Sequence, residues 1–202
     1  MSRSPRFRIQ STCVLMLMLV PSLCFSSVFL HQTPEELAAQ SDLVFVGKVV
    51  SMYSSFNGEH DINTYVKIKV YETAKGEPRS ERLVVVPGGQ APFQGSTYRR
   101  HYHGAAAFHE GEEVMVMVKI IDGKPVVQYF GSRFLLRTNE ESGEKEFVRE
   151  VPPNVEIIEK DSSESSDGQH THRISASSAY MTQEVYSYKD MMKRLHERKG
   201  AK

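Results

Sequence analysis

The sequence predicts a mainly β domain, a small antiparallel sandwich or barrel of five or six strands with a short helix before it and a longer helix after it. Two patterns lead to this fold class. In several segments between residues 43 and 150, apolar residues recur at every second position, which is the period of a strand with one buried face. Clusters of Gly, Pro, Asn and Asp separate these segments, as is typical of strands joined by short turns.

The 202-residue chain begins with the features of a secretory signal. Arg3, Arg6 and Arg8 precede an uncharged stretch, residues 9–30, whose apolar centre is followed by several serines. We therefore expect residues 1–26 to be a signal peptide and the mature protein to be secreted or periplasmic. The alternative is an uncleaved membrane anchor, because the uncharged stretch is just long enough to span a bilayer.

Cysteine usage and charge exclude several classes of function. Both cysteines, Cys13 and Cys24, lie within the predicted signal, so thiol catalysis and cysteine-based metal sites are excluded for the mature chain. The whole sequence has 25 basic and 25 acidic residues, and the predicted cleavage removes basic residues only. Binding to nucleic acid requires a clustered basic surface, so we expect no nucleic-acid partner.

The predicted domain, residues 33–155, opens with a short helix. Thr33 is a capping residue, Pro34 suits the first helical position, and Glu36 follows the cap by three residues, which completes a capping box. We expect the helix to end near Ser41. The almost continuous apolar run that follows, residues 43–50, predicts a strand that is partly buried on both faces.

The later strands are predicted from alternation. In the longest segment Val114, Val116 and Val118 share one face, and Met115 and Met117 share the other. We expect the two methionines to lie beneath the C-terminal helix or a loop. The strands expected after the first are residues 65–71, 83–86, 113–121, 126–129 and 133–138, with a weak one at 147–148.

The C-terminal part changes in composition. Residues 156–180 are rich in Ser, Asp, Glu, Gly and His, offer little to bury, and predict a flexible linker. In residues 181–199, Val185, Met191 and Leu195 lie among apolar residues at three- and four-residue spacings, which predicts an amphipathic helix. This helix could pack on the β domain, bind a partner or remain in solution.

Four segments carry a family resemblance: Leu37–Val50, Tyr65–Gly76, Val85–Gln90 and Phe108–Val118. Their order resembles a poorly characterised group of secreted bacterial proteins with an oligonucleotide-binding-type (OB) β-barrel, distantly like the netrin-type domain of metalloprotease inhibitors. The resemblance covers about residues 34–137 and implies a five-stranded OB-like barrel and, by fold analogy, a binding role. Such inhibitors hold a protease zinc through an N-terminal cysteine. The predicted mature chain has none, so that mechanism is not carried over.

The segment from Pro87 to Gly111 is the candidate site. In an extended backbone, His101 and His103 point to the same side about 7 Å apart. Two imidazoles so placed could share a zinc or copper ion, with His109 or a glutamate completing the ligands. The alternative is a solvated surface loop in which the histidines have no such role.

The same segment holds a second candidate set, Arg99, Arg100 and Tyr102. The two arginines could bind an anion such as a phosphate or a sugar acid, next to an aromatic ring.

The function predicted is therefore an exported, non-enzymatic binding or accessory module that presents residues 87–111 to a ligand, with a protein as the expected partner. No segment matches a nucleophile elbow or a phosphate-binding loop, and we expect no cofactor. One alternative is a metal-binding protein or metal-dependent hydrolase that uses His101, His103 and His109. Another is a structural accessory subunit that docks through its C-terminal helix. The oligomeric state and the identity of the partner are left open.

Overall fold

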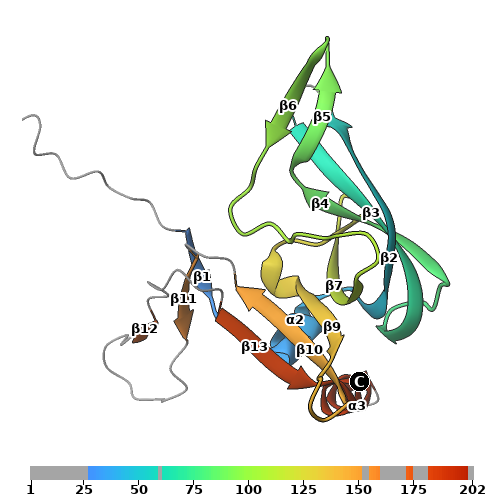
Figure 1. Cartoon of the computed structure of the whole chain (residues 1–202), viewed down its shortest axis with the longest axis vertical. Helices are drawn as coiled ribbons and strands as arrows, with labels where there is room; N and C mark the ends of the chain where they lie inside the picture. Colours follow the sequence, from blue (N-terminus) through green and yellow to red (C-terminus); the bar gives the residue numbers. More distant parts are fainter. Residues whose placement is uncertain (1–26, 59–60, 152–154, 160–171, 175–181, 200–202) are drawn as a thin grey trace, which may run out of the picture.

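The structure, a computed structural model, describes residues 27–58, 61–151, 155–159, 172–174 and 182–199. The predicted signal peptide, residues 1–26, and most of the predicted linker, residues 156–180, lie outside the described residues. The described part is mainly β, with the helix α2 (Pro34–Gln40) near its N-terminus and the helix α3 (Tyr188–Lys199) at its C-terminus (Figure 1). The predicted mainly β class with a helix near each end is confirmed.

The main sheet has eight strands, so the prediction of five or six is wrong. One edge strand of this sheet was not predicted as a strand: it lies in residues 182–187, which the sequence predicted to be part of the C-terminal helix. In spatial order the strands are β13 (Thr182–Ser187), β10 (Lys145–Val151), β9 (Arg133–Thr138), β7 (Glu113–Ile121), β2 (Leu43–Asn57), β3 (Asp61–Lys75), β4 (Glu81–Pro87) and β8 (Lys124–Val126).

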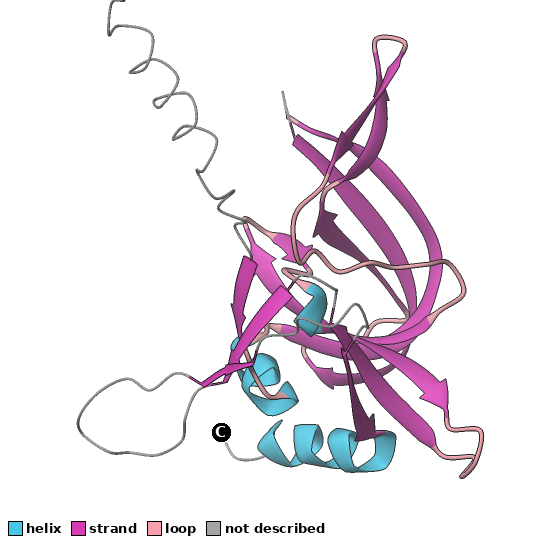
Figure 2. Ribbon diagram, turned by 60° about the vertical axis from the view of Figure 1, so that its left-hand side comes forward, coloured by secondary structure: helices cyan, strands magenta, loops and turns pink. Residues whose placement is uncertain are grey.

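The sheet also folds back on itself. The short strand β8 pairs in parallel with β4 and antiparallel with β7, so the pairings from β7 through β2, β3, β4 and β8 return to β7. The long strands β2 and β3 curve strongly (Figure 2), and their register shifts at three places between Val44 and Ser51. Such irregularities bend an antiparallel ladder, which lets the sheet return to its starting strand.

Two hydrophobic cores lie on opposite faces of the central strands. One face of β7 places Val114, Val116 and Val118 in a core with Phe45 and Val66. The second core, on the other face, is the methionine core, whose buried members include Leu37, Val46, Met115, Met117, Phe134, Phe147, Met191, Met192 and Leu195.

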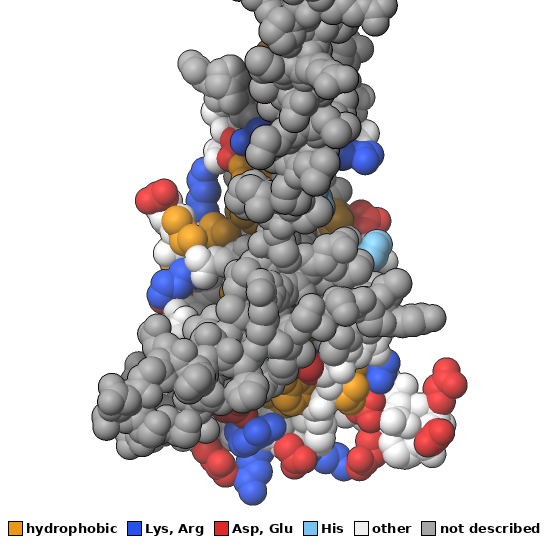
Figure 3. Space-filling model, turned by 90° about the vertical axis from the view of Figure 1, so that its left-hand side faces the viewer, with side chains coloured by type: hydrophobic (Ala, Val, Ile, Leu, Met, Phe, Trp, Pro, Cys, Tyr) orange, Lys and Arg blue, Asp and Glu red, His pale blue; other side chains and the backbone are white. Residues whose placement is uncertain are grey.

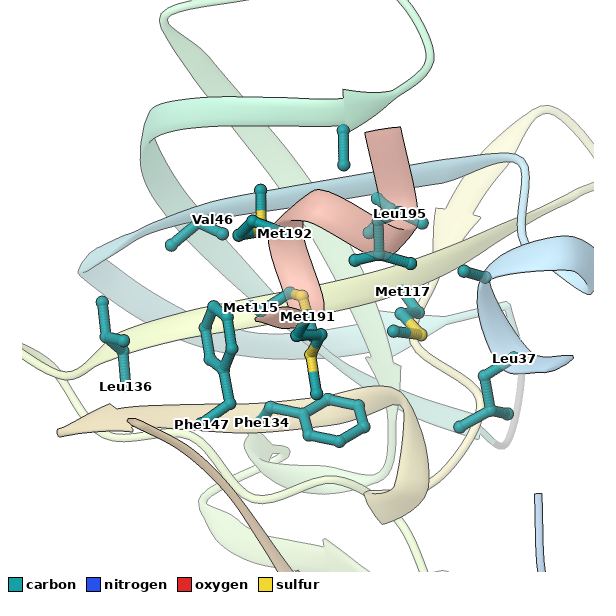
Figure 4. Packing of buried hydrophobic residues seen from close by; sticks show 13 residues of the cluster. Leu37, Val46, Met115, Met117, Phe134, Leu136, Phe147, Met191, Met192 and Leu195 are labelled. Carbon is teal, nitrogen blue, oxygen red and sulfur yellow. The ribbon is translucent and has the colours of Figure 1, made fainter. Parts of the chain in front are cut away.

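Figure 4 shows the methionine core at close range, with Met191 of α3 beside Met115 of β7 and near the rings of Phe134 and Phe147. The prediction that Met115 and Met117 cover the second face of their strand, beneath the C-terminal helix, is confirmed. The cause is the two-residue period of the strand, which places alternate side chains on opposite sides of the sheet.

The predicted capping box of α2 is confirmed. The Glu36 backbone N–H donates to Thr33 Oγ1 at 3.2 Å, and the Thr33 backbone N–H donates to Glu36 Oε2 at 2.9 Å. At the other end of α2, Lys75 Nζ donates to the carbonyl oxygens of Ala38 and Ala39, which fixes the helix on β3. Cations near helix C-termini satisfy carbonyl groups that have no partner within the helix.

The prediction of one helix over residues 181–199 is correct only for its second part. Residues Thr182–Ser187 form β13, which pairs antiparallel with β10 over six residues, and α3 follows directly. Glu184 and Tyr186 point toward Arg149 and the methionine core, so packing on β10 outweighs the helical spacing of this segment.

Parts of the predicted linker are also strands. β11 (Val155–Glu159) pairs in parallel with β1 (Ser27–Leu30) and antiparallel with β12 (His172–Ile174), which makes a separate three-stranded sheet. A third sheet is the hairpin of β5 (Gly89–Phe93) and β6 (Ser96–Arg100). This hairpin projects at the end of the molecule opposite to α3 (Figure 1). Neither described helix is long and apolar enough to cross a membrane.

Candidate functional site

The segment predicted as one long loop, residues 87–111, contains the β5–β6 hairpin. The two strands are joined by Gln94 and Gly95, whose φ angles are 47° and 76°. Positive φ angles at both central residues define the type I′ turn, which matches the twist of a tight β-hairpin. In the sequence, the Gln94–Gly95 pair was the indication of this turn, and our prediction of one long loop missed it.

The hairpin is fixed on the body of the sheet at its first residue. A side chain at Gly89 would collide with the hydroxyls of Thr64 and Ser54, so only glycine allows β5 to lie this close to β2 and β3. Thr64 Oγ1 donates to the Gly88 carbonyl at 2.8 Å, and the Gly88 N–H donates to the Ile62 carbonyl at 2.8 Å. The base of the hairpin is therefore held at a defined place.

Phe56, Phe93 and Tyr98 form what we call the aromatic cluster. The ring centroid of Phe56 lies 5.2 Å from that of Phe93 and 6.2 Å from that of Tyr98, and the latter two are 5.8 Å apart. Phe93 is 45% exposed and Tyr98 is 49% exposed. The three rings hold the hairpin on β2, and two of them still present a large apolar area to solvent.

Arg100 and Tyr102 lie together beside this cluster. The Tyr102 hydroxyl donates to Asp61 Oδ1 at 2.8 Å, and the Arg100 guanidinium lies 5.6 Å from the centre of the Tyr102 ring. Arg99 points to the other side of β6, where its guanidinium donates to Gln90 Oε1 at 2.8 Å. All three predicted binding residues are thus at the hairpin, with the two arginines on opposite faces.

The structure brings two of the three predicted metal ligands together. The rings of His101 and His103 lie edge to face, with centroids 5.5 Å apart. His109 is bound elsewhere: its Nδ1 lies 2.8 Å from Glu112 Oε1. Within the described ranges, no group of three or more His, Cys, Asp or Glu side chains is placed to hold a metal ion.

The partner of His109 belongs to an ion-pair network. Arg133, which is buried, contacts Glu112 at 2.6 Å and Glu150 at 3.1 Å, and it lies over the ring of Phe108. Burial by itself would raise the pKa of Glu112, but the hydrogen bond and charge of Arg133 outweigh burial and hold that pKa below its ordinary value. This network fixes the end of the segment to β9 and β10.

A second polar cluster, which the sequence did not predict, surrounds Arg149. This arginine is only 4% exposed, and it donates to Glu184 at 3.0 Å and to the Gln32 carbonyl at 2.7 Å. Its guanidinium also lies 3.1 Å from His31 Nε2. The cluster joins the segment before α2 to β10 and β13. Because its charges are paired with one another, we assign it a role in the fold.

Charges of both signs lie close together where the described side chains can be seen. In Figure 3 the visible Lys and Arg side chains, at the margins of this view, are interspersed with Asp and Glu.

A comparison with models of protein families, with curated proteins and with solved structures finds no match to this chain. The resemblance to OB-type and netrin-like domains therefore stays a prediction.

Proposed function

We propose that this chain is an exported, non-enzymatic binding module that recognises a protein partner through the β5–β6 hairpin. The observation that supports the proposal is the exposure of Phe93 and Tyr98, which pack on Phe56 next to Arg99 and Arg100. Aromatic residues and arginine are enriched at the centres of protein interfaces, where they contribute much of the binding energy.

The sequence around the hairpin supports the same proposal. Between Pro87 and His109 the chain has no Asp or Glu, but it has two arginines and three histidines. In a chain with no net charge, this concentration of basic residues would favour an acidic partner through complementary charge.

We also propose the small OB-like barrel as the architecture that carries this hairpin. The ring of pairings from β7 through β2, β3, β4 and β8 supports it. In this architecture β9, β10 and β13 extend the sheet beyond the barrel, and β5 and β6 lie in the connection between β4 and β7. Export rests on the sequence pattern of residues 1–26.

The two alternative functions have less support. A metal ion at His101 and His103 would need further ligands from outside the described residues. An accessory role for α3 would have to use its polar face, because its apolar residues Met191, Met192 and Leu195 are buried in the methionine core.

The proposal is tested by partner capture with residues 27–202. We expect the double variant Phe93→Ala/Tyr98→Ala to lose a partner that the parent chain retains from extracts of the producing cells. Ile120→Ala/Ile121→Ala is a matched control, because both isoleucines are exposed and lie at the end of β7. Arg99→Glu is a second variant, since it reverses a charge and leaves the aromatic cluster intact. Retention of the partner by all variants would contradict the proposal.

A further inference from the structure

The strand β6 has an unpaired edge. Within the described part of the chain it is hydrogen-bonded only to β5, and all five of its residues are exposed. Figure 1 shows β5 between β6 and the body of the sheet, so the second edge of β6 faces outward. An edge of this kind offers unpaired N–H and C=O groups to any extended chain that approaches it.

The hairpin geometry identifies which backbone groups point outward. In a two-residue type I′ hairpin the residues flanking the turn, Phe93 and Ser96, form a hydrogen-bonded pair. Hydrogen-bonded and non-hydrogen-bonded pairs then alternate along an antiparallel ladder. Thr97 is opposite Pro92 and Arg99 is opposite Gln90, so these are the non-hydrogen-bonded pairs. The N–H and C=O groups of Thr97 and Arg99 therefore point to the free edge of β6.

The two edges of the hairpin are not equivalent. On β5 the corresponding outward positions are Gln90 and Pro92, and Pro92 has no N–H to donate. Proline at an outward position blocks the addition of another strand. On β6 both outward positions, Thr97 and Arg99, keep their N–H groups. An added strand is thus directed to β6.

The charge of the hairpin selects the chemistry of the added strand. Arg99 lies on one face of β6 and Arg100 on the other, and the hydrogen bonds of the Arg99 guanidinium go to the neutral amide of Gln90. The Arg100 guanidinium lies 4.0 Å from Asp61 Oδ1, a long ion pair between two exposed side chains that leaves the arginine accessible to a further carboxylate. A strand added beside β6 would therefore have the guanidinium of one arginine near each of its two faces. Acidic side chains at successive positions alternate between the two faces of a strand and would meet both arginines. Pairing of β6 with a second copy of itself would instead bring like charges together.

We propose that β6 accepts an extended, acidic segment of the partner as an additional strand. This inference rests on the proposed function and names the form in which the partner is recognised. Main-chain hydrogen bonds to Thr97 and Arg99 would supply affinity, and the two arginines would select acidic sequences, as in other cases of recognition by strand addition.

The probe for the experiment is a short synthetic peptide that alternates Glu and Val, labelled with a fluorophore and titrated with residues 27–202. We expect Thr97→Pro to weaken its binding about tenfold or more, because the variant removes one outward N–H. Thr97→Val is the matched control: it keeps the N–H, has a similar shape, and should bind as the parent does. A peptide with proline in place of valine keeps the charges, cannot join a sheet, and should not bind.

The outcomes separate this inference from the proposed function. Equal binding by Thr97→Pro, or by the proline peptide, would overturn strand addition. If Phe93→Ala/Tyr98→Ala still lost the partner, the proposed function would nevertheless stand. Sedimentation of the parent chain as a dimer that Thr97→Pro dissociates would overturn the acidic partner in favour of self-pairing.

Discussion

Arg149 shows how one buried cation connects segments that are distant in the sequence. Its guanidinium contacts Glu184 on β13, the carbonyl of Gln32 before α2, and the ring of Phe134 on β9. A buried charge is tolerated only when its hydrogen bonds are satisfied, and here the protein itself supplies the acceptors. The side chain therefore depends on three segments being in place at once.

Replacing Arg149 by Met should destabilise the protein strongly, because Glu184 would be left partly buried without its cation. We expect a loss of about 2–4 kcal/mol in the free energy of unfolding, measured by urea titration followed by circular dichroism. Lys193→Met, at an exposed position of α3, should change it by less than about 0.5 kcal/mol.

The double variant Arg149→Met/Glu184→Gln should recover part of the loss, since no charge is then left unpaired. Equal urea midpoints for the parent chain and Arg149→Met would show that the cluster contributes nothing to stability.

At the residue scale, the sequence predicted the neighbours at the site but not the distant partners. Arg99, Arg100 and Tyr102 lie within four consecutive positions, so their proximity follows from the chain itself. Phe56 contacts Phe93 because Gly89, which has no side chain, allows β5 to lie close to β2. Such contacts depend on how hairpins are placed in space, which residue spacing does not encode. For the same reason His109 was grouped with the other histidines, although Glu112 holds it elsewhere.

At the scale of elements, α3 is defined by the sheet face beneath it. Met191, Met192 and Leu195 are buried against Met115, Met117, Phe134 and Phe147 of the methionine core. A helix of this length has little stability alone in water, so its formation depends on this packing. The thioether side chain is flexible and fills irregular spaces, which suits the contact between a helix and a twisted sheet.

Met191→Ala should leave a cavity at the centre of this contact and destabilise the protein by about 2–5 kcal/mol. Met191 is fully buried, whereas Lys193 is on the exposed side of α3, where its ion pair is with the exposed Glu197, so Lys193→Ala is a control that we expect to change stability little. Differential scanning calorimetry of both variants measures the change. The assignment of α3 to the core would be wrong if the two variants melted at the same temperature.

Elements with strong local signals were predicted closely, and elements that depend on packing were not. α2 begins at its capping box, and β7 and β9 have the predicted bounds, because alternation and turn residues specify them locally. In the sequence, Val185 continues the three-residue spacing of Tyr188 and Met191, but its segment becomes the strand β13, because it pairs with β10 and is held by Arg149. A run of six residues is too short for its period to decide between helix and strand.

For the whole molecule, titratable groups set the pH range of stability. Burial would raise the pKa of Glu184, but the hydrogen bonds from Tyr186 and Arg149 and the charge of Arg149 outweigh burial and hold that pKa below the ordinary 4.5. Arg133 lowers the pKa of Glu112 in the same way. Burial and a hydrogen bond to Glu184 raise the pKa of Tyr186 to about 12. Burial and Glu72 raise the pKa of Tyr188 to about 12.

The sign of each contribution follows from proton uptake in the folded and unfolded states. The lowered carboxyl pKa values add stability above about pH 4.5, and this is lost as the pH falls through the folded values. The raised tyrosine pKa values add stability below about pH 10, and this is lost between about pH 10 and 12. We expect the free energy of unfolding, measured by urea titration across pH, to be highest between these limits.

In Tyr186→Phe/Tyr188→Phe the free energy of unfolding should fall less steeply with rising pH above about pH 10, because the variant has no phenol at these positions to ionise. Tyr53→Phe, at an exposed position, is the control and should keep the slope of the parent chain. An unchanged alkaline slope in the double variant would show that other groups cause the loss.

The methionine core gives the protein a particular sensitivity to oxidants. With both cysteines in the predicted signal, thioethers are the sulfur groups available to oxidation after cleavage. Met115, Met117, Met191 and Met192 are all buried, so hydrogen peroxide or hypochlorous acid would reach them mainly when α3 opens from the sheet. Each sulfoxide formed would place a polar group where an apolar one had packed and would keep α3 from closing again. Met52, which is only partly buried, can be oxidised without such an opening. Loss of the fold should therefore follow oxidation of the methionine core, at a rate set by the opening of one helix.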